Sequence, residues 1–352
     1  MSEDRRPFRF GLIGAGVAAE IHVAAMRTIA GVEVHAIADA APERARALAS
    51  RHGIPEVYES GDALAERAAV DAVAVLTPHH LHLPYVRAAA RAGRHVLVEK
   101  AIAHTVAAAD ELIEACRAHG VTLAGIFQNR FTPAARRLRD TVANGGLGRV
   151  FLAAVTVNEY RAPSYFLTSP WRGRKAEAGG GVLMIQAIHM IDLLHWVLGM
   201  PRRVLAETHT VVHDVEVEDL AVGLLEFEGG VTAVLQATTA AVPAEPPSVE
   251  IRGDRGTARV SGSWGHLGFQ LSTGAPASDQ DIPAESDPTE PAIEPYAAQI
   301  ADFVAAVRHG RPPVVDGVEA RKALVVVDAL YRSAGTREWV TVDPVPSAAP
   351  RR

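Results

Sequence analysis

The sequence contains a single cysteine, Cys116, in a chain of 352 residues. One thiol excludes an intrachain disulfide and a structural zinc site built on cysteines. Cys116 lies in a stretch with helical spacing, where a buried and unreactive thiol is expected rather than a nucleophile. The fifteen histidines are scattered and form no His-Glu-x-x-His motif, so the sequence predicts no metal site.

The sequence also lacks basic blocks and an apolar leader. No run of five basic residues occurs, and 41 acidic residues outnumber 35 Lys and Arg. Neither nucleic acid nor an anionic membrane is therefore an expected partner. The first residues lack the apolar core of a signal peptide, and no segment is expected to be long enough to span a bilayer. Together these absences predict a cytoplasmic protein.

A chain of this length is too long for one ordinary core and predicts two domains. In residues 8–128, apolar runs such as Phe8–Ile13 and Ala72–Leu76 alternate with helical stretches such as Pro42–His52. This alternation is typical of an α/β domain with a doubly wound parallel sheet.

The pattern changes in residues 129–342, where long strands predominate. Leu220–Phe227 and Val231–Ala240, joined through two glycines, read as a hairpin. The sequence predicts an α+β domain with a large open, mainly antiparallel sheet. Residues 1–7 and 343–352 are expected to form flexible tails.

A glycine-rich turn follows the first predicted strand. Gly14, Gly16 and Ala19 fit the Gly-x-Gly-x-x-Gly/Ala fingerprint of a Rossmann dinucleotide site. Asp39 ends the second strand, where a carboxylate accepts ribose hydroxyls and repels a 2′-phosphate, so NAD is expected rather than NADP. Alternatively, Asp39 caps the helix that begins near Pro42. The expected cofactor contacts on this turn are Gly14, Ala15, Gly16, Val17 and Ala18.

Polar residues follow two further predicted strands, at the edge of the sheet where ligands bind. Thr77, Pro78, His79 and His82 follow one strand, and Glu99-Lys100 follows the next. All are expected to contact the cofactor. Desolvation would lower the pKa of Lys100 and make it a usable acid or base near neutrality. Alternatively, its side chain extends to solvent and pairs with Glu99.

Three glycines, Gly179–Gly181, precede an apolar helix in which Gln186, His189 and Asp192 are polar. The glycines allow the backbone to approach a ligand closely. Helical geometry places the three polar residues on one arc. They face either hydrogen-bonding partners in the core or a binding cleft.

These motifs together resemble the glucose–fructose oxidoreductase, inositol dehydrogenase and rhizopine-catabolism (Gfo/Idh/MocA) family. The resemblance rests on residues 11–19, 77–82, 99–101, the triple-glycine helix and residues 296–313, and it covers nearly the whole chain. It implies NAD-dependent oxidation of sugar or cyclitol hydroxyls. It also implies that Lys100 transfers a proton with help from His189, and that the C-terminal sheet forms homodimers or homotetramers.

Two positions depart from the family pattern. Ala101 stands where the family has a proline, and Ile185 stands where it commonly has Asp or Asn. Without a carboxylate at Ile185, proton transfer is left to Lys100 and His189, or Gln186 must orient the substrate.

Residues 159–173 and the glycine helix resemble the branch containing UDP-N-acetylglucosaminuronate 3-dehydrogenases. Arg161 and Arg172 could bind a carboxylate or a phosphate, and Tyr160 and Trp171 offer flat faces for a sugar ring. Alternatively, these are ordinary surface arginines with aromatic neighbours. The expected substrate-binding set is Lys100, Arg130, Tyr160, Arg161, Trp171, Arg172, Gln186 and His189.

The sequence therefore predicts an NAD-dependent oxidoreductase acting on a secondary hydroxyl of a sugar, sugar acid, nucleotide sugar or cyclitol. No Tyr-x-x-x-Lys spacing occurs, which argues against the short-chain dehydrogenases. Two alternatives keep the fold: a non-catalytic regulator that binds dinucleotide or sugar, suggested by Ile185, and an NAD-dependent enzyme that cleaves glycosides.

Overall fold

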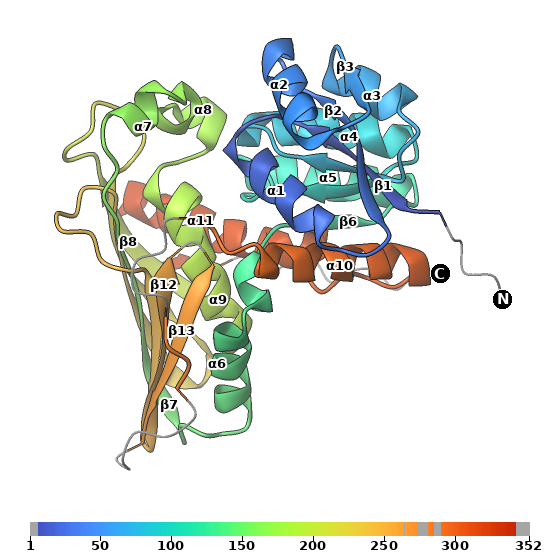
Figure 1. Ribbon diagram of the computed structural model, residues 1–352. Coiled ribbons are helices and arrows are strands. Elements are labelled where there is room, and N and C mark those ends of the chain that lie inside the picture. Colours follow the sequence, from blue (N-terminus) through green and yellow to red (C-terminus); the bar gives the residue numbers. More distant parts are fainter. Residues whose placement is uncertain (1–5, 264, 274–280, 285–289, 343–352) are drawn as a thin grey trace. The chain divides into compact units, whose positions relative to one another are not determined.

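The computed structural model describes residues 6–263, 265–273, 281–284 and 290–342 (Figure 1). The chain divides into two compact units. Residues up to Ile126 join Ile293–Arg321 in the first unit, and Phe127–Ala292 joins the residues from Lys322 onward in the second. Apart from Arg6 and Pro7, the predicted tails lie outside the described residues.

Helix α10 (Glu294–His309) makes the first unit discontinuous in sequence. Its Ile300, Phe303 and Val304 lie in one hydrophobic core with Phe8 and Phe10. The Phe303 ring lies 6.5 Å from that of Phe8 and 6.0 Å from that of Phe10. The predicted division between residues 128 and 129 assigns this helix to the other domain. An amphipathic pattern shows that a helix has an apolar face, but not which core receives it.

The first unit contains the predicted doubly wound parallel sheet. Its strands pair in the order β3-β2-β1-β4-β5-β6, and every pairing is parallel. The switch point lies between β1 and β4, and sheets of this kind bind ligands outside the carboxyl ends of the strands there. The strands are β1 (Phe8–Ile13), β2 (Val32–Ala38), β3 (Glu56–Tyr58), β4 (Ala72–Val75), β5 (His95–Val98) and β6 (Leu123–Gly125).

Helices connect these strands: α1 (Val17–Arg27), α2 (Pro42–His52), α3 (Gly61–Arg67), η1 (His79–Leu81), α4 (His82–Arg91) and α5 (Val106–Ala118). The Ser60 and Thr105 hydroxyls cap α3 and α5 by accepting the Ala63 and Ala108 backbone N–H groups, each at 3.1 Å. The sequence patterns predicted neither β3 nor α3, because segments this short show little periodicity.

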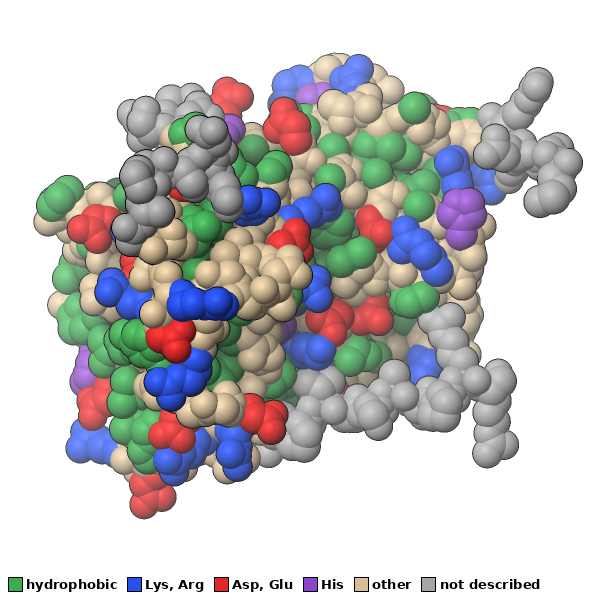
Figure 2. Space-filling view, turned by 90° about the horizontal axis from the view of Figure 1, so that it is seen from below, with side chains coloured by type: hydrophobic (Ala, Val, Ile, Leu, Met, Phe, Trp, Pro, Cys, Tyr) green, Lys and Arg blue, Asp and Glu red, His purple; other side chains and the backbone are tan. Residues whose placement is uncertain are grey.

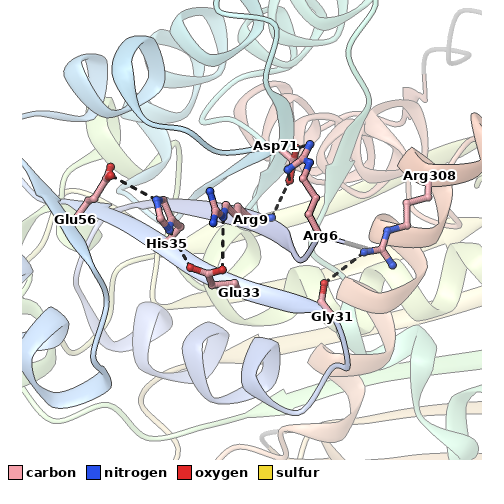
Figure 3. A network of polar contacts seen from close by, with 8 residues as sticks. All are labelled: Arg6, Arg9, Gly31, Glu33, His35, Glu56, Asp71 and Arg308. Carbon is pink, nitrogen blue, oxygen red and sulfur yellow. Dashed lines mark hydrogen bonds and ion pairs between the residues drawn. The ribbon is translucent and has the colours of Figure 1, made fainter. Parts of the chain in front are cut away.

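Charged side chains on the first strands form a network (Figure 3). The Arg9 guanidinium lies 3.5 Å from the Glu33 carboxylate, and the His35 ring lies 2.9 Å from Glu33 and 3.4 Å from Glu56. Because Arg9 and Glu33 are partners in the β1–β2 register, the ladder itself brings them together. The network therefore links three neighbouring strands.

The second unit contains the predicted open sheet. Its order is β13-β12-β11-β7-β10-β9-β8-β14, and only the β7–β10 pairing is parallel among the described strands. The strands are β7 (Val150–Asn158), β8 (Arg203–His209), β9 (Leu220–Glu226), β10 (Thr232–Thr238), β11 (Ser248–Gly253), β12 (Gly256–Ser263), β13 (His266–Ser272) and β14 (Val340–Thr341). The predicted α+β architecture is confirmed.

The two faces of this sheet differ. Helices α6 (Pro133–Ala143), α9 (Ile188–Leu198) and α11 (Gly317–Thr336) lie on one side of it (Figure 1). On the other face Val222, Leu224 and Val234 are exposed. Because Leu224 is the register partner of both Leu205 and Val234, apolar side chains form a row across three strands.

One segment is longer and more apolar than the sequence analysis expected. By length and composition, Lys175–Leu198 could cross a membrane, so the expectation that no segment reaches that length was wrong. Its apolar window is 67% buried, as a core helix would be, which makes this weak support for a membrane span.

On the face shown in Figure 2, basic and acidic side chains are interspersed without an extended patch of one sign.

Candidate active site

The glycine-rich turn lies between β1 and α1. Gly14 has a φ of +108°, and a Cβ there would lie 2.7 Å from the Leu76 carbonyl oxygen, so the turn itself requires glycine. A Cβ at Gly16 would meet nothing within 4 Å, and no side chain caps α1 at this residue. The first N–H groups of α1 are thus left open, as in sites that hold the phosphates of a dinucleotide. Val17 is 69% exposed on this turn, between Gly16 and the half-buried Ala18.

Asp39 follows β2, and backbone donors fix its carboxylate. Oδ2 accepts the Ala15 N–H at 2.7 Å, and Oδ1 accepts the Ala41 N–H at 2.8 Å. Each oxygen keeps a lone pair that a ribose hydroxyl can use. Capping of α2 alone does not account for the bond to Ala15. The turn and the carboxylate together fit the pyrophosphate and ribose of NAD.

The two histidines after β4 have different surroundings. His79 is buried in η1, and its Nε2 accepts the Ala101 N–H at 3.3 Å. His82 is fully buried, with Nδ1 3.2 Å from the Ile102 carbonyl oxygen and Nε2 2.9 Å from that of Thr77. Burial lowers the pKa of His82. A ring enclosed in this way ties two loops together and does not fit the predicted cofactor contact. Thr77 and Pro78 are half-buried beside it.

Glu99 and Lys100 form the turn after β5. Burial would raise the pKa of Glu99, but a hydrogen bond from His22 and the charges of His22 and Lys100 lower it to about 2. Oε1 lies 2.8 Å from His22 Nε2, and Oε2 accepts the Lys100 backbone N–H at 3.1 Å. The carboxylate therefore fixes the Lys100 backbone, and contact between Glu99 and the cofactor stays a prediction. The Lys100–Ala101 peptide bond is cis although alanine replaces the family's proline.

The triple glycine is explained by packing within the second unit. A Cβ at Gly180 would lie 1.9 Å from the Tyr331 hydroxyl, and one at Gly181 would lie 1.9 Å from the Glu218 carbonyl oxygen. Gly179 has a φ of +85° and ends α8 (Lys175–Ala178). Close approach of the chain to itself therefore accounts for glycine at positions 180 and 181.

The helix after the glycines begins as a π-helix, η4 (Leu183–Ala187), and continues as α9. π-helical turns are rare and frequent at functional sites. Gln186 and His189 are half-buried, and the His189 ring lies edge-on to Phe127 with centroids 6.2 Å apart. Ile185 is 9% exposed, so an apolar side chain occupies the position where the family commonly has a carboxylate.

Asp192 completes the predicted arc but pairs in the core. Its Oδ2 accepts Arg130 Nε at 2.8 Å and its Oδ1 accepts an Arg130 terminal nitrogen at 2.7 Å, with both side chains at most 1% exposed. Burial would raise the pKa of Asp192, but the charge of Arg130 lowers it. The Arg130 guanidinium also lies 5.6 Å from the Trp196 ring. This buried pair does not fit the prediction that Arg130 binds substrate.

The other predicted substrate residues gather around a tyrosine. The Arg161 and Arg172 guanidiniums lie 5.3 and 4.2 Å from the Tyr165 ring, and the Gln186 amide donates to the Tyr165 hydroxyl at 3.1 Å. Arg161 also pairs with Glu159 at 2.5 Å. Tyr165 was not among the predicted site residues, although it lies between the two arginines in sequence.

The aromatic residues differ in exposure: Tyr160 is 46% exposed, whereas Trp171 is half-buried, with its ring 5.7 Å from the Arg172 guanidinium. Arg172 has no ion pair with any described residue of this cluster. Burial raises the pKa of Tyr165, so its hydroxyl stays protonated at neutral pH. The cluster thus combines a cation, flat apolar faces and neutral hydrogen-bonding groups.

A polar cavity of about 160 Å³ lies elsewhere in the second unit, where Gly180, Glu218 and Tyr331 line it with part of β8. Neither Gln186 nor His189 lines it. Among the described residues, no three His, Cys, Asp or Glu side chains are grouped so as to hold a metal ion.

The parallel sheet, the open helix terminus and the fixed carboxylate define the first unit as an NAD-binding Rossmann domain of an oxidoreductase. Residues 8–127 match the model for the oxidoreductase family with an NAD-binding Rossmann fold, and residues 135–259 match the GFO/IDH/MocA C-terminal domain. The chain belongs to the GFO/IDH/MocA family of oxidoreductases, which act on CH–OH groups.

Similar proteins align with nearly the whole chain. It is 33% identical to 1,5-anhydro-D-fructose reductase of Ensifer adhaerens over 95% of this chain and 98% of the relative. It is 32% identical to an NADP-dependent D-xylose 1-dehydrogenase of Haloferax volcanii over 95% of this chain and 99% of that protein. The crystal structure of the WlbA dehydrogenase from Bordetella pertussis, in complex with NADH and UDP-GlcNAcA, is 28% identical, with a TM-score of 0.87 over 96% of this chain and 100% of that one.

Proposed function

We propose that this protein is an NAD-dependent oxidoreductase acting on a secondary hydroxyl of a sugar, sugar acid, nucleotide sugar or cyclitol, or catalysing the reverse reduction. The observation that carries the proposal is Lys100, which directly follows β5 on a backbone that Glu99 fixes, in the unit that fits NAD. The sugar-related names of its relatives support the substrate class.

Lys100 is the proposed proton acceptor. Bound NAD supplies the hydride acceptor, so the carbinol carbon loses a hydride while its hydroxyl loses a proton, and a carbonyl forms. The Lys100 amine takes that proton with help from His189, as general base catalysis requires. Because Ile185 offers no carboxylate, the Gln186 amide is left to orient the substrate.

We also propose that the substrate carries an anionic group. Arg172 supports this, because it is a half-buried cation held against Tyr165 and has no acidic partner in its cluster. A guanidinium forks onto carboxylate or phosphate oxygens, and aromatic faces suit a sugar ring. Arg161 is a weaker candidate because Glu159 already neutralises it.

The preference for NAD over NADP rests on Asp39. Both of its oxygens are held by backbone donors, so the charge cannot swing away from a 2′-phosphate. Arg44 and Arg46, the nearest following arginines, are exposed on α2.

The open face of the second unit's sheet is the proposed contact for a homodimer or homotetramer. The row of Leu205, Leu224 and Val234 supports this, because an apolar row on an otherwise uncovered sheet marks an interaction surface. Operation in the cytoplasm stays a prediction.

The test is turnover with purified protein. Reduced nicotinamide is followed by absorbance across inositols, aldoses, sugar acids and nucleotide sugars, with NAD or NADP. Lys100→Ala should lower kcat by about 10²–10⁴-fold while NAD affinity stays nearly intact, since general acid–base catalysis contributes that much. Lys175→Ala, which alters an exposed lysine of α8, is the matched control and should remain active.

Each alternative has its own outcome. Tight NAD binding without turnover of any substrate would favour a non-catalytic regulator. Glycoside cleavage without net NADH would favour the glycoside-cleaving enzyme. A largely active Lys100→Ala variant would refute the proposed role of the lysine.

A further inference from the structure

Glu218, a residue outside the predicted site, lies just before β9 in the second unit. Its Oε2 accepts the Gly181 N–H at 2.8 Å, and its Oε1 accepts the Leu183 N–H at 3.0 Å. Its backbone carbonyl accepts the Val182 N–H at 3.0 Å, and Oε1 also accepts the Tyr331 hydroxyl at 2.8 Å. One glutamate thus receives three consecutive backbone N–H groups at the start of the π-helix.

The first N–H groups of a helix have no partner within it and are usually satisfied by a cap on the preceding residue. Here the acceptor comes from a residue 35 positions along the chain from Leu183, so tertiary structure holds this helix end in place. Tyr331 comes from α11 and fixes the carboxylate in turn.

The two glycines make the contact close. Because a Cβ at Gly180 or Gly181 would lie 1.9 Å from Tyr331 or Glu218, no other residue fits without displacing one of them. We call Gly180, Gly181, Glu218 and Tyr331 the helix clamp. The helix clamp fixes the backbone of residues 181–183 in one place, and the helical segment of η4 and α9 continues from these residues.

We propose that Glu218 is a positioning residue: through the helix clamp it sets where His189 lies, and it thereby controls turnover without touching substrate. The inference rests on the proposed role of His189. Misplacing a group by about 1 Å can lower a rate about 10²-fold, so loss of one clamp bond should reach the chemistry.

Glu218→Gln is the principal variant. Glutamine keeps the size and one acceptor oxygen but replaces the other with an NH₂ group, which cannot accept the Gly181 N–H. Burial raises the pKa of Glu218, so the charged carboxylate destabilises the folded protein. This loss of stability appears as the pH rises through the folded pKa. Glutamine removes this cost while losing one hydrogen bond, so we expect Tm at neutral pH to change little.

The matched control is Glu216→Gln. Glu216 is two residues away and also accepts a backbone N–H, from Lys175 at 3.0 Å, but that N–H belongs to α8. We expect Glu218→Gln to lower kcat by about 10–100-fold with NAD affinity unchanged, and Glu216→Gln to behave as wild type. Tyr331→Phe removes one bond to the same carboxylate and should lower kcat less.

A double-mutant cycle separates positioning from general destabilisation. If Glu218 acts through His189, Glu218→Gln should have little further effect on kcat in a His189→Ala background. Equal loss in both backgrounds, or wild-type kcat in Glu218→Gln, would overturn the proposal. Should Glu218→Gln fail to fold, the same cycle with Tyr331→Phe decides.

Failure of the proposed function remains distinguishable. If wild type turns over no substrate, the clamp is tested by NMR of ¹³C-labelled histidine, with the His189 signal assigned from its loss in His189→Ala. A displaced His189 signal in Glu218→Gln but not in Glu216→Gln would support the clamp. An unchanged signal would refute it.

Discussion

Asp192→Asn is expected to destabilise the second unit. The change removes the charge opposite Arg130, whose side chain is 1% exposed and whose guanidinium donates two hydrogen bonds of 2.7 and 2.8 Å to the carboxylate. Breaking a buried pair by neutralising one partner costs about 3–5 kcal/mol, because the other charge is left uncompensated. Since asparagine keeps one acceptor oxygen, we expect about 3 kcal/mol, or a fall in Tm of about 6–12 °C for a unit of this size.

Tryptophan fluorescence during urea unfolding reports on this change, because the described tryptophans, Trp171, Trp196 and Trp339, belong to the second unit. The pH dependence has a definite sign. Because the pKa of Asp192 is lowered in the folded state, the stability it contributes is present above the pKa of an unfolded aspartate. That contribution is lost as the pH falls through the folded pKa, so the two proteins should converge only in strongly acidic solution.

The double variant Arg130→Met with Asp192→Leu tests the reasoning further. Apolar replacement of both partners of a buried pair is often neutral or stabilising. Because Asp192 also lies 3.3 Å from the buried His195 ring, which leucine cannot bond, stability should rise above that of Asp192→Asn without fully reaching wild type. Turnover should be retained, because the structure gives Arg130 a core role. A stable but inactive double variant would show instead that Arg130 binds substrate. An Asp192→Asn variant as stable as wild type would refute the energetic argument.

Two further predictions concern the first unit. Asp39→Ala should raise the KM for NAD by about 10–100-fold, which is the equivalent of losing one hydrogen bond to a charged group. The KM for NADP should rise less. An unchanged ratio of kcat/KM for NAD to kcat/KM for NADP would contradict the assignment. Asp71→Asn should cost about 1–2 kcal/mol at neutral pH, because Asp71 accepts two bonds from Arg6, at 2.6 and 2.9 Å, and the Arg9 N–H at 2.9 Å (Figure 3). Burial would raise the pKa of Asp71 but Arg6 lowers it, so this loss should fade as the pH falls through the folded pKa; a loss that persists in strong acid would count against it.

Local chemistry predicted the first unit well. The strand Phe8–Ile13 and the helix Pro42–His52 have the predicted bounds, because each is a short periodic stretch between turn residues. The turn at Gly14 and the carboxylate of Asp39 were also found from spacing, since both lie at fixed offsets from strand ends.

The site residues divide according to what each side chain meets. Gln186 and His189 stay half-buried on their helix, whereas Asp192, three residues further, pairs with Arg130, 62 residues away in sequence. His82 likewise turns inward to two carbonyl groups. Spacing places a polar residue on an arc, but it does not reveal which distant residue satisfies it.

The sequence by itself determined the two sheets, the cofactor fingerprint and the membership of a family. The sheets and the fingerprint follow from periodicity and from short motifs, and the family follows from the order of several such motifs along the chain. Only the tertiary structure decided that α10 belongs to the first unit, that Arg130 is a core residue and that the triple glycine packs against Glu218 and Tyr331. Each of these depends on contacts between residues far apart in the chain. Such contacts leave no periodic pattern in the sequence, because the burial of each partner is decided only when the core forms.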